Sequence, residues 1–280
     1  MPLPKNNSNT QTYLAPKLDQ ISKALVSARL GASPLAEFPG ELPATLDDAY
    51  AVQDASIARW PDRVAGWKVG MVAEELRAKL GATRLAGPIF EPTVFAIEPE
   101  ETRSMSIYRG GFAAVEAEFV LQLADIIEPS GAVYSDQDLL DRIAGLHIAA
   151  EIASSPMADV NRLGPCCVVC DFGNNAGLLV GPSIADWSQR HLDELTAKTI
   201  VDDATVGAAD AGVIDGGPLQ ALRFLVELCA TRGLTLAQGT YVSCGAVTGI
   251  HDVTTDSSAR LDFGVFGSFD VKFDPVQPRS

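Results

Sequence analysis

The sequence predicts an α+β protein, and three observations support that class. Apolar residues recur at helical spacing near the start of the chain, whereas from about residue 111 the pattern shifts toward strands, with clean period-two alternation over Ala113–Ala124. The order is thus helices first and mixed strands afterwards, and it does not repeat as a βαβ array. With 280 residues, 47% of them hydrophobic, the chain can build one large domain or two closely joined ones.

The N-terminal part is predicted to be mainly helical. Residues 1–17 are polar and rich in Pro and Asn, without the features of a signal or transit peptide, so we expect a disordered lead-in. A helical repeat of apolar residues begins at Leu18, and Thr45 starts a second helix because Asp48 stands where the partner of an N-cap belongs. Next we expect a strand at Val64–Met71, a helix at Ala73–Leu80 and a surface loop at Leu85–Pro99.

The later part is predicted to consist mostly of strands. Two helices interrupt them: a short one capped by Ser135, and a longer one that Pro218 opens and Gly233 ends. We therefore divide the chain into an N-terminal helical part, residues 18–98, and a β-rich catalytic core, residues 99–280. The expected strands of the core are Ala113–Ala124, Leu146–Ala153, Cys166–Cys170, Leu178–Val180, Tyr241–Val247 and Leu261–Phe273.

Composition limits the partners and the compartment. The 36 acidic and 21 basic residues give a formal charge of −15, which argues against nucleic acid as a partner, although a bound cation can reverse the field locally for a small anion. No apolar run is long enough to span a membrane. Of the five cysteines, Cys166, Cys167 and Cys170 lie together without a second metal-binding pair, so we expect buried thiols in a reducing cytoplasm.

Two carboxylates in one strand are the strongest functional signal. In the segment Val115–Leu121, alternate residues share a face, so Glu116 and Glu118 stand side by side opposite an apolar face. Two like charges this close are costly to ionise, and a hard divalent cation between them would offset that cost. A solvated strand face is the structural alternative.

Glu151 favours the metal over that alternative. It lies in the almost entirely apolar segment Gly145–Ala153, where an ionised carboxylate is costly unless it is paired. The same strand has no Lys or Arg to serve as its partner. We therefore predict that Glu116, Glu118 and Glu151 form one metal site.

Lys68 is the candidate for catalysis. In the strand Val64–Met71 it shares one face with Gly66 and Gly70, which leave room for a ligand to approach the backbone. Its ammonium could then meet a substrate oxygen or carbon. The structural alternative is a surface lysine on an edge strand.

The three histidines carry less information. His147 alternates onto the side of Glu151 and is expected to be a satisfied core histidine, while His191 lies in a polar stretch and should be exposed. His251 follows a loop and borders the expected site. No Gly-x-Ser-x-Gly elbow, Ser–His–Asp set, dinucleotide fingerprint or phosphate-binding loop is present.

Taken in order, the motifs resemble the 2-keto-4-pentenoate hydratase and 4-oxalocrotonate decarboxylase group of the fumarylacetoacetate hydrolase superfamily. The resemblance extends from Leu18 to Phe273. The matching segments are Gly66–Gly70, Gly87–Phe90, Glu116–Glu118, Ala150–Ile152, Gly216–Leu219 and Cys244–Gly249.

This resemblance implies a mixed β-roll core preceded by a helical part, and a homo-oligomer. It implies Mg²⁺ or Mn²⁺ at the three glutamates, catalysis by Lys68, and substrate contacts from Asn175 and Thr248. Members of the group act on products of aromatic-ring cleavage, so the implied substrate is a small 2-oxo or 2-hydroxy-dienoic acid. The expected activity is a hydratase of aromatic-compound catabolism.

Departures from the family pattern bear on the substrate. Leu85 stands where the family often has Asp, Ala246 replaces a usual Ser, and the segment Asp171–Asn175 is altered. A decarboxylase of the 4-oxalocrotonate type is the main alternative. A C–C hydrolase is less expected, because no histidine precedes His147, and a metal-binding partner subunit without turnover is a further alternative.

Overall fold

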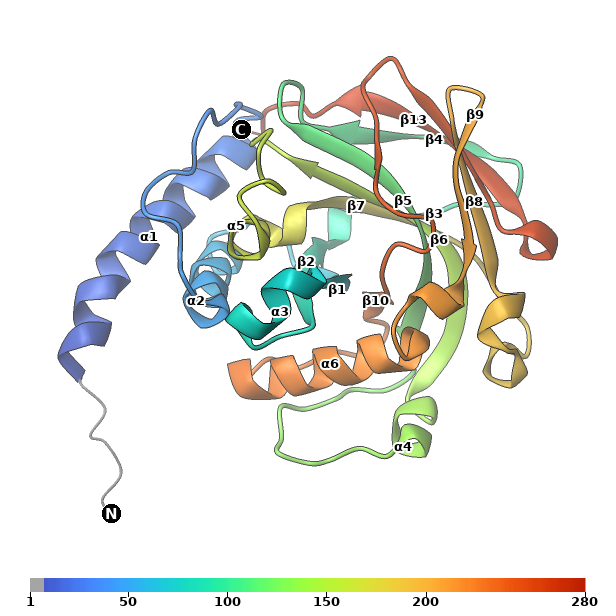
Figure 1. Ribbon diagram of the computed structural model, residues 1–280, viewed down its shortest axis with the longest axis horizontal. Coiled ribbons are helices and arrows are strands. Elements are labelled where there is room, and N and C mark those ends of the chain that lie inside the picture. The colour runs from blue at the N-terminus through green and yellow to red at the C-terminus, as the bar shows by residue number, and fades with distance from the viewer. Residues whose placement is uncertain (1–7, 280) are drawn as a thin grey trace.

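Two curled sheets dominate the computed structural model, which describes residues 8–279 and is of the mixed α+β class (Figure 1). The strands of the larger sheet are β1 (Val64–Met71), β2 (Arg84–Phe90), β3 (Val94–Ala96), β5 (Phe112–Leu123), β6 (Ile143–Ser155), β7 (Asn175–Ser183), β10 (Tyr241–Ser243) and β11 (His251–Asp252). Their order is β2-β1-β10-β5-β6-β7-β3, and β11 pairs with β5. The curl of this sheet brings β2 close to β7, although four strands separate them in the order.

The smaller sheet closes one side of the larger one. Its strands are β4 (Thr102–Ile107), β8 (Thr196–Val201), β9 (Ala204–Asp210), β12 (Ser258–Asp262) and β13 (Ser268–Pro275), in the order β4-β13-β12-β8-β9. The main core lies between the sheets, where Val115, Ala117 and Phe119 of β5 are fully buried in one cluster with Phe263 and Phe269. This is the apolar face that the alternation along β5 predicts.

The helices lie along the larger sheet. They are α1 (Ser8–Leu30), α2 (Leu46–Ile57), α3 (Glu74–Leu80), α4 (Asp136–Leu140), α5 (Pro165–Cys170) and α6 (Gly217–Arg232), with short 3₁₀ helices at Glu91–Thr93, Phe172–Asn174, Trp187–Gln189, Leu192–Glu194, Ala211–Val213 and Gly264–Phe266. In Figure 1, α1, α2 and α5 gather at one end of the molecule, and α6 runs across its lower part, just above α4. The first three share a second core, whereas α6 packs into the main one.

Several predicted helix ends are confirmed by their capping contacts. Thr45 Oγ1 accepts a hydrogen bond from the Asp48 N–H at the start of α2, and Ser135 forms a capping box with Asp138 at the start of α4. A left-handed glycine, Gly233, ends α6 as expected. These local signals were visible in the sequence because each acts within one turn of chain.

Other segments correct the sequence analysis. Leu85–Pro99 is not a surface loop, because its first part forms β2, which is buried throughout between β1 and the 172–174 turn. Cys166–Cys170 lies in the helix α5, with Pro165 in its first turn, because a short apolar run fits a buried strand and a buried helix equally well. The strand expected at Tyr241–Val247 ends at Ser243. The one expected at Leu261–Phe273 is split into β12 and β13 by a tight turn.

The predictions for the N-terminal segment and for the domain division are only partly tested by the described residues. Of the expected lead-in, residues 1–7 lie outside the described part of the chain, and α1 begins at Ser8. The division at residues 98 and 99 stays a prediction; β1, β2 and β3 from the first part share a sheet with strands of the second. Within residues 8–279, no helix is long and apolar enough to cross a membrane.

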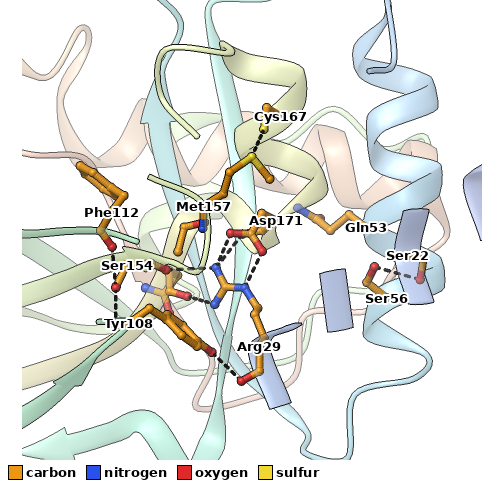
Figure 2. A network of polar contacts seen from close by, with 12 residues as sticks. Ser22, Arg29, Gln53, Ser56, Tyr108, Phe112, Ser154, Met157, Cys167 and Asp171 are labelled. Carbon is orange, nitrogen blue, oxygen red and sulfur yellow. Dashed lines mark hydrogen bonds and ion pairs between the residues drawn. The ribbon is translucent and has the colours of Figure 1, made fainter. Parts of the chain in front are cut away.

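A buried arginine fastens the end of α1 to this framework (Figure 2). The Arg29 guanidinium donates to the Asp171 carboxylate at 2.6 and 2.9 Å, and to the carbonyl oxygens of Asp171, Ser154 and Asn175 at 2.9, 3.1 and 2.9 Å. Both side chains of the ion pair are almost fully buried. The network therefore joins α1, β6, the end of α5 and the start of β7.

Candidate metal centre and its cavity

The three predicted carboxylates meet on the inner face of the curled sheet. Glu116 and Glu118 are two residues apart on β5, and the antiparallel register places Glu151 of β6 directly opposite Glu116. One carboxylate oxygen from each residue lies within 4.8 Å of the other two. All three residues are buried, with exposed fractions of 3%, 1% and 0%. The cluster is therefore a convergent site and not a solvated strand face.

Each carboxylate has a different set of partners. Glu118 Oε2 accepts hydrogen bonds from the Gly245 N–H at 3.0 Å and from the Ser243 hydroxyl. Glu151 Oε1 accepts one from Asn175 Nδ2 at 3.0 Å. In contrast, Glu116 Oε1 and Glu151 Oε2 are buried and have no hydrogen-bond partner. These two free oxygens belong to facing residues of paired strands.

Burial and nearby negative charge disfavour the ionised forms of Glu116 and Glu118. Burial raises the pKa of Glu116 to about 7, although Lys68 opposes the rise and Glu151 adds to it. Burial also raises the pKa of Glu118 well above its usual value, and the charges of Glu151 and Glu116 raise it further. Oxygen donors that lack partners and repel one another fit a hard divalent cation, so the residues present can hold one.

Lys68 is brought to this cluster by the curl of the sheet. Its strand β1 lies three places from β6, a separation of roughly 14 Å in a flat sheet. Yet Lys68 Nζ lies 3.6 Å from Glu151 Oε1. The lysine is buried and its strand lies between β2 and β10, so it is not a surface residue on an edge. Burial alone would lower the pKa of Lys68, but the three carboxylates outweigh that effect and raise it.

Glycines make room for the lysine side chain. A Cβ atom on Gly173 would lie 3.0 Å from Lys68 Cδ, and one on Gly87 would lie 2.2 Å from the Phe172 carbonyl oxygen. Gly173 also has a φ of +67°, which favours glycine. The turn at Phe172–Asn174 can therefore pack closely against the Lys68 stem, which fixes the position of the ammonium.

A cavity of about 530 Å³ opens above the charged cluster. Lys68, Glu116 and Glu118 line it, and Glu151 is enclosed just behind them. Leu85 and Ala246, the two departures from the family pattern, also line the cavity. The volume is within the usual range for a small-molecule site.

The two residues expected to contact the substrate lie outside that lining. Asn175 sits behind Glu151 and holds its carboxylate, while the neighbouring Asn174 faces the cavity with an unpartnered Oδ1. Thr248 Oγ1 is instead hydrogen-bonded to Thr199 Oγ1 at 2.7 Å and lies 3.2 Å from His251 Nε2. The position of Asn174 could not be predicted from strand alternation, because Asn174 belongs to a turn with a left-handed backbone conformation.

The remaining reactive side chains take no part in the cluster. His147 is partly buried, with Nδ1 3.0 Å from the Gly181 carbonyl oxygen, as expected for a satisfied core histidine. All five cysteines are buried thiols, and burial raises the pKa of Cys167 to about 12. Sequence reasoning missed Ser243 and Asn174, because their places depend on the pairing of β10 with β5 and on the 172–174 turn. Gly245 lies in the matching segment Cys244–Gly249, but its hydrogen bond to Glu118 was not predicted.

No family model matches the chain, and no curated protein matches it in sequence. Solved structures do match it in fold. The structure of 4-oxalocrotonate decarboxylase from Pseudomonas putida G7, complexed with magnesium and adipate, aligns with a TM-score of 0.76 and 19% identity over 97% of this chain and 100% of that one. Fumarylpyruvate hydrolase from Pseudomonas aeruginosa, in complex with Mn²⁺ and pyruvate, aligns with a TM-score of 0.56 and 12% identity over 78% and 91%.

A third match is 5-carboxymethyl-2-hydroxymuconate delta-isomerase from Mycobacterium smegmatis, with a TM-score of 0.52 and 12% identity over 77% of this chain and 81% of that one. The three matches are a decarboxylase, a hydrolase and an isomerase, and this chain shares their fold. The resemblance predicted from the motifs is therefore confirmed at the level of the fold.

Proposed function

We propose that the protein is a divalent-metal-dependent hydratase that adds water to a 2-hydroxy-2,4-dienoate or its 2-oxo-alkenoate form, in the catabolism of aromatic compounds. One observation carries this proposal. Three buried carboxylates, two of them with an unpartnered oxygen, and one buried lysine converge at the base of a single cavity. Mg²⁺ or Mn²⁺ is the expected ion, since the donors are carboxylate oxygens without Cys or His.

The cluster suits a substrate whose negative charge grows during reaction. A bound divalent cation supplies Lewis-acid polarisation of a 2-oxo group. In the metal-free protein the surrounding carboxylates raise the pKa of Lys68. Its ammonium can donate a hydrogen bond to the 2-oxo oxygen as negative charge develops there. A bound cation would offset part of the carboxylates' effect, and Lys68 could then also relay a proton to the substrate during ketonisation.

Asn174 lines the cavity wall. Its Nδ2 donates to Asn161 Oδ1 at 3.0 Å, and its Oδ1 is buried without a partner. No covalent nucleophile is needed, in keeping with thiols that burial holds in the protonated form.

A decarboxylase of the 4-oxalocrotonate type is the second candidate, favoured by the fold match over nearly the whole of both chains. The cavity wall favours the hydratase. 4-Oxalocrotonate carries a carboxylate at each end. Among the residues that line the cavity, the only cationic side chain besides Lys68 is the exposed Arg162. A second carboxylate would find no buried partner there.

The discriminating experiment is a screen of 2-hydroxydienoates and 4-oxalocrotonate with Mg²⁺ or Mn²⁺. Loss of dienoate absorbance without CO₂ release supports the hydratase, and CO₂ release identifies the decarboxylase. Exhaustive chelation should abolish either activity, and added metal should restore it. If neither the dienoates nor 4-oxalocrotonate is turned over, the protein is instead a metal-binding partner subunit without catalytic activity.

We also propose a homo-oligomer in the cytoplasm. Five buried free thiols suit a reducing compartment. Light scattering of the purified protein tests the assembly, and a monomeric mass at micromolar concentration would contradict it.

A further inference from the structure

Much of the cavity wall is apolar, beginning beside the charged cluster. Leu85, Val168 and Ile214 are buried in the wall, and Met71, Val213 and Ile250 lie toward its solvent-exposed side. The last three are exposed by 39%, 56% and 54%. They are three of the eight large hydrophobic side chains that are exposed within residues 16–279, so part of the exposed apolar surface lies at this cavity.

Charged groups along the wall do not suit a second anionic group. Arg162 is a cationic side chain of the wall, but it is 71% exposed and already forms an ion pair with Asp159. Its Nε and Nη2 donate to Asp159 Oδ1 and Oδ2 at 2.9 and 2.5 Å. Glu75, also exposed, would repel an anion. The only buried cation in the lining is Lys68, which faces the carboxylates.

Leu85 sets the chemistry next to the reacting end. In the pairing of β1 with β2, Leu85 lies opposite Gly70, and both are on the face that carries Lys68. A Cβ atom on Gly70 would lie 3.6 Å from both Leu85 Cδ1 and Lys68 Nζ. An aliphatic side chain therefore lies beside Gly70, on the sheet face that carries the Lys68 ammonium.

We infer that the cavity selects a monocarboxylic 2-oxo acid whose far end is an uncharged hydrocarbon tail. Leu85, Val168 and Ile214 enclose the part of the tail nearest the reacting carbons, and Met71, Val213 and Ile250 cover its outer part. The inference rests on the proposed function, since it assigns the tail of that substrate. It makes Leu85 and the three exposed residues the determinants of specificity.

Binding of unreactive saturated 2-oxo acids tests this independently of turnover. Titration calorimetry on the Mg²⁺-loaded protein would compare 2-oxobutanoate, 2-oxohexanoate and 2-oxooctanoate with the dicarboxylate 2-oxoadipate. Affinity should rise by up to about fourfold for each added methylene, until the tail extends beyond Ile250. 2-Oxoadipate should bind at least about tenfold more weakly than 2-oxohexanoate, which has the same number of carbons, because its second carboxylate would be desolvated without a partner.

Two surface variants sharpen the test. Ile250→Lys places a cation at the outer part of the wall, so it should weaken the binding of 2-oxooctanoate and strengthen the binding of 2-oxoadipate. Val265→Lys makes the same change at a 93% exposed residue outside the cavity and should alter neither. Both positions are exposed, so both proteins are expected to fold.

The outcomes separate this inference from the proposed function. The inference of an apolar tail is wrong if affinity does not depend on tail length. It is also wrong if 2-oxoadipate binds most tightly and Arg162→Ala abolishes that binding. Neither result contradicts a metal-dependent enzyme. Failure of every 2-oxo acid to bind the metal-loaded protein overturns the proposed function itself. If Ile250→Lys dissociates an oligomer while leaving tail dependence unchanged, the exposed residues belong to a protein interface, and their role in specificity is wrong.

Discussion

Two groups of buried charges lie close together in this molecule and are built on opposite principles. Arg29 and Asp171 form one positive and one negative charge, and the guanidinium also donates to three carbonyl oxygens (Figure 2). The second group has three carboxylates, Glu116, Glu118 and Glu151, against the single ammonium of Lys68, an excess of two negative charges. Two of its carboxylate oxygens lack partners.

The difference separates a structural ion pair from a binding site. A buried charge that is paired and hydrogen-bonded is complete, and removing one partner is costly. A buried group of like charges with free oxygens is complete only when a cation joins it. The two groups are equally buried, so burial does not distinguish them. They differ in whether each buried polar atom has a hydrogen-bond or ion-pair partner.

The largest effect on stability is expected at the complete pair. Arg29→Met leaves the Asp171 carboxylate buried without its partner and should lower the free energy of unfolding by about 3–5 kcal/mol. Urea unfolding at fixed metal concentration measures it. Arg260→Met provides the control, since Arg260 is part-exposed in its pairs with Glu100 and Asp270 and should lose about 1 kcal/mol or less. A loss at Arg29 no larger than at Arg260 would show that this pair does not hold α1 in place.

Removing the ammonium from the incomplete group should act on turnover. Lys68→Met keeps most of the apolar stem but cannot donate to the developing oxyanion, so turnover should fall by about 10²–10³. Stability should change little in the Mg²⁺-loaded protein, where the cation still offsets the carboxylates. Lys198→Met, at a lysine that is 46% exposed, should change neither quantity. Near-normal turnover of the Lys68 variant would contradict a catalytic role, and a collapsed melting temperature in the loaded protein would make the role structural.

Removing a carboxylate from the same group should act on metal binding. Glu151→Gln keeps the volume and loses one charge, so Mg²⁺ affinity should fall by at least about 100-fold, beyond the usual cost of losing a residue that only orients a ligand. Without metal, the fold should be retained, because the change also removes a repelling charge. Titration calorimetry measures the affinity, and Glu98→Gln is an exposed control. Unchanged Mg²⁺ binding would show that Glu151 is not a ligand.

The same comparison shows how far the sequence could lead. Period-two alternation was enough to place Glu116 and Glu118 together, and an apolar context was enough to mark Glu151. Nothing local could show that Lys68 pairs with Glu151, since that contact depends on the curl of a sheet in which their strands are three places apart. The prediction for the Cys166–Cys170 segment failed on secondary structure for a related reason, because burial on all sides removes the periodicity that distinguishes helix from strand.

The smallest expected effect is a pH dependence that only the incomplete group should show. Burial raises the pKa of Glu116 to about 7 and raises that of Glu118 well above its usual value, so at low pH protons occupy these carboxyls in the metal-free protein. A cation binds the ionised forms and must displace these protons, so Mg²⁺ affinity should rise by at least about tenfold per pH unit below pH 7. Calorimetry in buffers of different ionisation enthalpy counts the protons released. Glu116→Gln should bind more weakly, with a shallower pH dependence. Affinity that is flat between about pH 5.5 and 7 would mean that Lys68 alone keeps the carboxylates ionised, and the two groups of charges would then be more alike than their hydrogen bonds indicate.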